Sequence, residues 1–173
     1  MRFRYVNMLM LFALVLASSV PLMAQDDMEC EDGYRYFEHE LLISEPTCIP
    51  EDPQRIISLD MAGTEFLAYM GEPLIGSFGY VLDEVSALSP QLADTLADVQ
   101  PFDWPPNLEL VTELEPDLII AFGDVSLELA GLDAIAPLLI YDPYANKGVW
   151  NASTGFYAQA VELDDEFAEM YEL

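Results

Sequence analysis

Positive charge is scarce in this sequence. Its 173 residues include 5 lysines and arginines, 32 acids and a single histidine. Two of the five cations, Arg2 and Arg4, precede residue 25, so the remaining chain has a formal charge of 3 − 32 = −29 with histidine neutral. Such a charge repels polyanions and excludes nucleic acid and anionic membrane surfaces as partners. The acids are scattered, and we interpret most of them as a solvated surface.

Signatures of catalysis and of metal binding are also missing. The sequence has no G-x-S-x-G motif and no glycine-rich phosphate loop, and no nucleophile is indicated near its one histidine, His39. The acids between residues 26 and 32 lack the glycine and the spacing of a calcium loop. Glu38 and Glu40 flank His39 on an expected strand, where neighbouring side chains face opposite sides. We therefore expect no enzyme activity, no metal site and no cofactor.

The one long apolar stretch lies at the amino terminus. Arg2 and Arg4 precede an apolar run from Met8 to Val20, and Ala24 offers a small residue for cleavage. This pattern predicts a signal peptide over residues 1–24. The stretch is short for a membrane-spanning helix, and no cysteine follows the cleavage point for lipid attachment. We expect a periplasmic or secreted protein.

Cysteine is limited to Cys30 and Cys48. In an exported chain, two cysteines favour one disulfide. A metal pair is the alternative, but it lacks further cysteine ligands. We predict that this disulfide closes an amino-terminal arm over residues 25–52.

Apolar runs bounded by turn residues recur after the arm. Predicted strands occupy Ile56 to Leu59, Leu74 to Phe78, Leu118 to Phe122 and Leu138 to Tyr141. Predicted helices between them occupy Gly63 to Met70, Leu108 to Leu114 and Ser126 to Ile135. Residues 79–106 are the least regular part, where we expect at most one or two helical turns over Gln91 to Leu96 and a short strand over Ala97 to Gln100. This alternation predicts an α/β lobe over residues 53–150, with three layers and a mostly parallel central sheet flanked by helices. From about Thr154, apolar residues at spacings of three and four predict one amphipathic helix to the end.

Five stretches of this region also follow the ordered pattern of a known family. They are Pro53 to Leu59, Thr64 to Gly71, Pro73 to Gly76, Pro106 to Ile120 and Ile135 to Asp142. Together they resemble the amino-terminal lobe of the periplasmic binding proteins that serve ABC importers of iron-siderophore complexes, haem and vitamin B12. The resemblance implies a long helix leading to a second lobe. We interpret residues 151–173 as the start of that helix, and the second lobe as absent from this chain.

Aromatic residues after the predicted strands suggest a ligand site, because ligands of parallel sheets lie beyond the carboxyl ends of the strands. Aromatics there suit a large, flat, partly apolar ligand. For Phe122 and Tyr141 we favour a place in the core. The resemblance supports ligand contact for Tyr80 and Trp104 and adds the residues after the first strand. The predicted ligand-binding set is Asp60, Met61, Ala62, Tyr80, Phe102, Trp104, Gly123 and Trp150.

The resemblance also implies a docking residue and a function. In the family, the acid of an Asn-Leu-Glu motif meets an arginine pocket on the membrane permease. The resemblance implies this role for Glu109. We expect a monomeric substrate-binding component that captures a ferric siderophore for an ABC permease and its ATPase. The strong negative charge favours a neutral or cationic complex over an anionic one. Vitamin B12 or haem as ligand, and an exported single-lobe interaction module without transport, are the alternatives.

Overall fold

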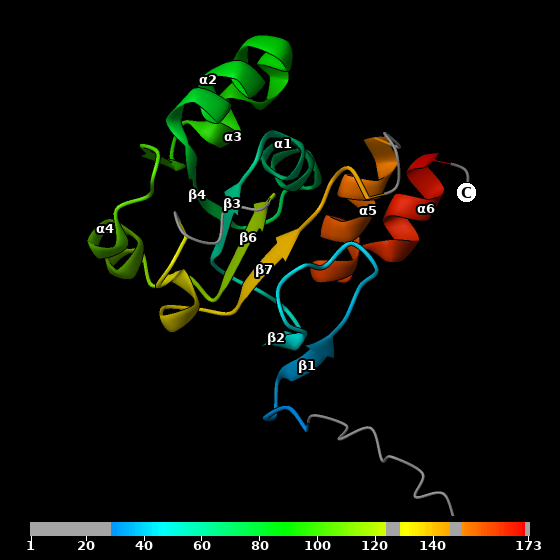
Figure 1. Ribbon diagram of the computed structural model, residues 1–173. Helices are drawn as coiled ribbons and strands as arrows, with labels where there is room; N and C mark the ends of the chain where they lie inside the picture. The colour runs from blue at the N-terminus through cyan, green and yellow to red at the C-terminus, as the bar shows by residue number, and fades with distance from the viewer. Residues whose placement is uncertain (1–28, 124–128, 146–149, 172–173) are drawn as a thin grey trace, which may run out of the picture.

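A five-stranded parallel sheet forms the centre of the molecule (Figure 1). The structure is a computed structural model that describes residues 29–123, 129–145 and 150–171, so the predicted signal peptide lies outside the described residues. The strand order is β5-β4-β3-β6-β7. These strands are β3 (Ile56–Leu59), β4 (Leu74–Phe78), β5 (Gln100–Phe102), β6 (Leu118–Phe122) and β7 (Leu138–Tyr141). Because all five run in parallel, their carboxyl ends meet at one edge.

Hydrophobic clusters bury both faces of the sheet, which explains why its strands are apolar runs rather than alternating ones. Ile57 packs with residues of α2 (Gly79–Leu88) and α4 (Leu108–Glu113). Its neighbour Ile56 packs on the opposite face with α1 (Met61–Met70) and α5 (Trp150–Ala160). Figure 1 shows α4 on one side of the sheet and α5 on the other. The predicted α/β fold, with a parallel sheet flanked by helices, is confirmed.

The region between β4 and β5 is more helical than we predicted. It contains α2, the 3-10 helix η1 (Pro90–Leu92) and α3 (Ala93–Leu96). Val81, Leu82 and Val85 are buried on one side of α2, at helical spacing. Phe78 at the N-cap makes no side-chain cap hydrogen bond. This helix therefore lacks the capping residue that would have marked its start in the sequence.

The predicted helix over Ser126 to Ile135 is wrong in its described part. Residues 126–128 lie outside the described residues, and the remainder forms a turn and the 3-10 helix η2 (Leu132–Ala134). Gly131 adopts φ 93°, a left-handed conformation that interrupts an α-helix. The short η2 then leads directly into β7.

The arm forms a separate two-stranded hairpin beside the main sheet. Strand β1 (Tyr34–Phe37) pairs antiparallel with β2 (Thr47–Pro50). The disulfide between Cys30 and Cys48 is present, which confirms the predicted pairing. Between the two strands the chain runs along the outer edge of β7, where Ile43 N donates to Ile140 O at 2.8 Å and Asp142 N donates to Leu41 O at 2.9 Å.

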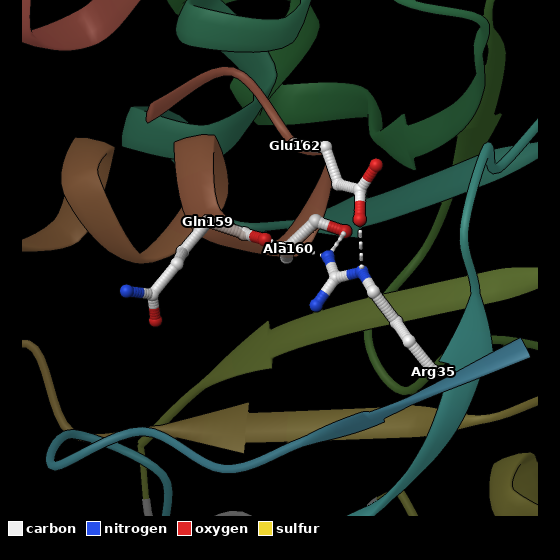
Figure 2. A network of polar contacts seen from close by, with 4 residues as sticks. All are labelled: Arg35, Gln159, Ala160 and Glu162. Atoms are coloured by element: carbon white, nitrogen blue, oxygen red, sulfur yellow. Dashed lines mark hydrogen bonds and ion pairs between the residues drawn. The ribbon is translucent and has the colours of Figure 1, made fainter. Parts of the chain in front are cut away.

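The carboxyl-terminal segment is two helices, not the single helix that the apolar stripe predicts. Helix α5 ends at Ala160, and α6 (Asp164–Tyr171) begins after a turn in which Glu162 has φ 58°. Arg35 of the arm donates to the carbonyls of Gln159 and Ala160 at 2.6 and 2.9 Å and pairs with Glu162 at 3.0 Å (Figure 2). This guanidinium satisfies helix-end carbonyls and stabilises the break.

The helices found in the described part of the chain are all too short or too polar to cross a membrane. The assignment of residues 151–173 to an interlobe helix, and the division of the chain at residue 150, stay predictions.

Candidate ligand site at the carboxyl ends of the strands

A hollow of about 220 Å³ lies at the carboxyl edge of the sheet. Leu59 at the end of β3 and Ala121 and Phe122 at the end of β6 form part of its lining. Tyr80 and Trp104, which follow β4 and β5, contribute its aromatic part, and Leu129 completes the lining. The residues come from four neighbouring strands or the segments after them, which is where ligands of open parallel sheets bind.

Tyr80 and Trp104 are held in place by one buried aromatic residue. Phe78 stacks on Tyr80 with ring centroids 5.5 Å apart and meets the Trp104 ring at 5.3 Å in an edge-on arrangement. Phe78 itself is completely buried at the end of β4. Tyr80 and Trp104 remain 57% and 48% exposed. The side of each ring that faces away from Phe78 therefore remains available to a ligand, although Phe78 fixes both rings from below.

Tyr80 occupies a different element from the one expected. It lies in the first turn of α2 and not on a loop. Burial raises the pKa of its hydroxyl, and the nearby charges of Asp60 and Glu84 raise it further. The hydroxyl is therefore a neutral hydrogen-bonding group across the physiological range.

Phe102 lies in the core, which differs from the exposed position that we expected. Its side chain is 3% exposed and belongs to the cluster beneath the hollow. The ring packs so closely over Gly76 that a Cβ there would come within 2.5 Å of it. Phe102 thus supports the platform under Tyr80 and Trp104, and only a small surface of it is left for any ligand.

Asp60 is buried as well, with 3% of its surface exposed. It is the N-cap of α1, where its Oδ1 accepts from Gly63 N at 2.8 Å. Its other oxygen accepts from the hydroxyl of Tyr157, and the Tyr141 hydroxyl is a further hydrogen-bond partner. Desolvation raises the pKa of Asp60 above its usual value, although these hydrogen bonds oppose the shift. This carboxylate faces the interior instead of lining the hollow.

Hydroxyl groups extend this buried polar network between β3, β4, α1 and α5. The Tyr157 and Ser58 hydroxyls are 3.0 Å apart, and Thr64 Oγ1 lies 2.7 Å from Ser77 Oγ. Thr64 Oγ1 also donates to the Asp60 carbonyl at 2.6 Å. The network joins the first strands to a helix almost one hundred residues later in the chain.

Met61, Ala62 and Gly123, the other predicted ligand residues whose side chains or backbone the structure describes, do not line the hollow. Met61 and Ala62 are half-buried in the first turn of α1, and Ala62 lines a separate hollow of about 240 Å³ beside Tyr69. Gly123 is half-buried directly after β6 with φ 82°. Trp150 opens α5, but its side chain lies outside the described residues. For these residues and for Asp60, ligand contact stays a prediction.

Four apolar residues of the hollow, Leu59, Ala121, Phe122 and Leu129, were missing from the predicted set. Leu59 and Phe122 end their strands, and Leu129 follows β6 after residues outside the described ranges. For Phe122 we favoured a core position, yet it is half-buried and lines the hollow. Position at the carboxyl end of an apolar run was the signal in the sequence that could have identified Leu59 and Phe122.

A larger groove of about 620 Å³ lies between the arm and the start of β7, and Leu129 lines both this groove and the hollow. Ser44, Pro46 and Thr47 line it from the arm, and Gly131 and Leu138 line it from the lobe. Leu138 begins β7, so this groove extends away from the carboxyl edge. None of the predicted ligand residues contributes to it.

Glu109 is exposed in the first turn of α4. Asn107 caps this helix, accepting from Glu109 N at 2.8 Å and from Leu110 N at 3.3 Å. A carboxylate at this position is favourably placed relative to the helix dipole. Its contact with a permease stays a prediction.

Comparisons with known proteins point to one group of binding proteins. No protein-family model matches the chain. The probable siderophore-binding lipoprotein YfiY of Bacillus subtilis (strain 168) is 31% identical over 133 residues, which are 70% of this chain and 37% of the relative. The FhuD protein from S. pseudintermedius has a similar solved structure, with a TM-score of 0.61 and 26% identity over 80% of this chain and 47% of that one.

A third similarity concerns the fold alone. The structure of FhuD2 from Staphylococcus aureus with bound ferrioxamine B has a TM-score of 0.58 and 22% identity, and it covers 69% of this chain and 43% of that one. The chain thus spans less than half the length of the relatives that it matches. It is a relative of the siderophore-binding proteins of ABC importers and has the fold of about half of such a protein. These relatives are binding proteins and not enzymes.

Proposed function

We propose that this chain is an exported substrate-binding component that captures a ferric siderophore and delivers it to an ABC permease. The observation behind the proposal is the hollow with Tyr80 and Trp104 at the carboxyl edge of the sheet. Relatedness to a probable siderophore-binding lipoprotein supports it. The iron is cargo inside its chelator, so the protein needs no metal ligand or cofactor of its own.

The proposed location is outside the cytoplasm, after cleavage at Ala24. Although the Bacillus subtilis relative is named a lipoprotein, Cys30 of this chain is bonded to Cys48. We propose that the protein acts as a monomer and that the ligand lies on the hollow. Affinity will depend in part on the contacts of Tyr80 and Trp104, which line the hollow.

Ligand binding should quench the fluorescence of one tryptophan. The chain has 2 tryptophans, and Trp104 lines the hollow. We expect saturable quenching of the mature protein by a ferric siderophore. Quenching should largely disappear in Trp104→Phe, because this change removes the reporter in the hollow. A loss of quenching in Trp150→Phe as well would support the predicted ligand contact of Trp150.

Titration of the same proteins with cobalamin and with haem tests the other ligand classes. If cobalamin or haem quenches the fluorescence saturably and no ferric siderophore of a panel does, then that compound, and not a siderophore, is the ligand. If a folded protein responds to no member of the panel, the capture function is wrong for this chain.

Reversing the charge of Glu109 should affect delivery and not capture. In Glu109→Lys we expect siderophore uptake by cells to fall about tenfold, because a charge-assisted contact with an arginine becomes repulsive. Affinity for the siderophore should stay unchanged, since Glu109 does not line the hollow. The matched control is Asp94→Lys, because Asp94 is also an exposed acid in the first turn of a helix, here α3. Wild-type uptake with Glu109→Lys would remove this residue from the docking surface.

A further inference from the structure

The two arginines among the described residues both bind carbonyls at helix ends. As shown above, Arg35 binds the carbonyls at the end of α5 and pairs with Glu162 (Figure 2). Arg55 donates from Nε to the carbonyls of Leu114 and Glu115 at 3.0 and 2.9 Å, at the end of α4. Each guanidinium is therefore held at a helix end by bonds to backbone carbonyls.

Neither arginine can reach a ligand in the hollow. Arg55 directly precedes β3, so it lies at the edge of the sheet opposite the carboxyl ends. Arg35 belongs to β1 in the arm hairpin. Lys147 lies outside the described residues, and the described ranges contain no other lysine or arginine. Among these residues, the hollow thus has no cation to bind an anionic ligand.

The groups that do surround the hollow attract positive charge. Tyr80 and Trp104 are each about half exposed, and the face of an aromatic ring binds ammonium and guanidinium groups through the ring quadrupole. Asp60 and Glu84 do not line the hollow, but their charges act on Tyr80, where they add to burial in raising the pKa of the hydroxyl. The chain around them is strongly acidic, which raises the local concentration of cations.

We propose that this hollow selects ferric siderophores by charge, favouring complexes that present a cationic group to Tyr80 and Trp104 over anionic ones. The inference rests on the proposed function and narrows its substrate class. Hydroxamate complexes that carry an amine have this character, whereas tris-catecholate complexes are strongly anionic. The groups on the outside of the siderophore complex, and not the atoms that bind its iron, decide which complex the hollow prefers.

Three probes separate charge from shape. Iron(III) desferrioxamine B keeps a free ammonium group, its N-acetylated form is uncharged and nearly isosteric, and an iron(III) tris-catecholate is anionic. Calorimetric titration of the mature protein should show the cationic complex binding about tenfold more tightly than the acetylated one. The catecholate should bind most weakly. The preference for the cation should shrink between about 50 and 500 mM salt, because screening weakens the attraction.

Substitution of the rings tests where the selectivity arises. Tyr80→Leu and Trp104→Leu should each reduce the ratio between the cationic and the acetylated complex, since leucine keeps an apolar contact without a ring face. Tyr69→Leu is the matched control, because Tyr69 is a 62% exposed aromatic of α1 outside the hollow. It should leave the ratio unchanged.

Two outcomes would overturn the inference in distinguishable ways. Equal binding of the charged and acetylated complexes, or tighter binding of the catecholate, would overturn the charge selectivity while leaving siderophore capture intact. Failure of all three complexes to bind a folded protein would overturn the capture function and the inference with it.

Discussion

Gly63→Ala should destabilise the fold by about 3 kcal/mol, although alanine is normally the better residue inside a helix. Gly63 lies in α1 where this helix crosses α5, and an added Cβ would overlap the ring of Tyr157. Tyr157 is completely buried and hydrogen-bonded to Asp60 and Ser58, so its ring cannot move aside. The free energy of unfolding, measured by urea denaturation, tests this expectation.

Gly155→Ala is the matched control for that substitution. Gly155 is also helical, but an added Cβ would meet the Phe167 ring at 3.4 Å, close to ordinary contact. It should be neutral or slightly stabilising because alanine has the higher helix propensity. The cost of Gly63→Ala should also shrink in a Tyr157→Leu background. A Gly63→Ala protein as stable as the wild type would show that α1 and α5 are not in this close contact.

Asp60→Ala should cost about 3 kcal/mol as well, because it removes the N-cap of α1 and leaves buried donors without an acceptor. The donors are Gly63 N and the hydroxyls of Tyr157 and Tyr141. Asp60→Asn keeps a cap oxygen of the same shape and should cost much less. Denaturant titration of the two variants at one pH measures the difference.

The pH dependence of Asp60→Asn has a defined sign. Burial raises the pKa of Asp60 in the folded state above its usual value of 3.8, so the folded state holds this proton more tightly than the unfolded chain. The stabilisation from that proton is complete below about pH 3.8 and is lost as the pH rises through the folded pKa. Asparagine does not titrate. The stability of Asp60→Asn relative to the wild type should therefore increase from pH 4 upward, and a constant difference between pH 4 and pH 8 would contradict the raised pKa.

Most strands of the main sheet could be predicted from the sequence because each of them is largely buried and therefore consists mainly of apolar residues. Strands β3, β4, β6 and β7 have the predicted bounds, since each is an apolar run between turn residues. The start of α2 was missed because Phe78 offers no side-chain cap. The break after α5 depends on Arg35, which lies more than one hundred residues earlier in the chain. The sequence of the carboxyl-terminal segment alone therefore could not predict the break between α5 and α6.

In the site, too, features set by nearby residues could be predicted and features set by distant contacts could not. Tyr80 and Trp104 could be found because position after a strand, at a fixed edge, follows from topology. The burial of Asp60 could not, because its partner Tyr157 is 97 residues away in the sequence and only the packing of α5 on the sheet brings them together. Phe102 was misplaced for a similar reason, since its burial depends on the space above Gly76.

Both outer edges of the main sheet are blocked, and this affects how the protein behaves among copies of itself. An unpaired strand edge offers backbone donors and acceptors on which another chain can add a strand, which leads to aggregation. The chain after β1 occupies the edge of β7 through its bonds to Ile140 and Asp142. At the other edge β5 is three residues long, and Pro101 at its centre has no N–H to offer. The sheet is thus kept closed to self-association at the β7 edge by an arm whose hairpin the disulfide holds together.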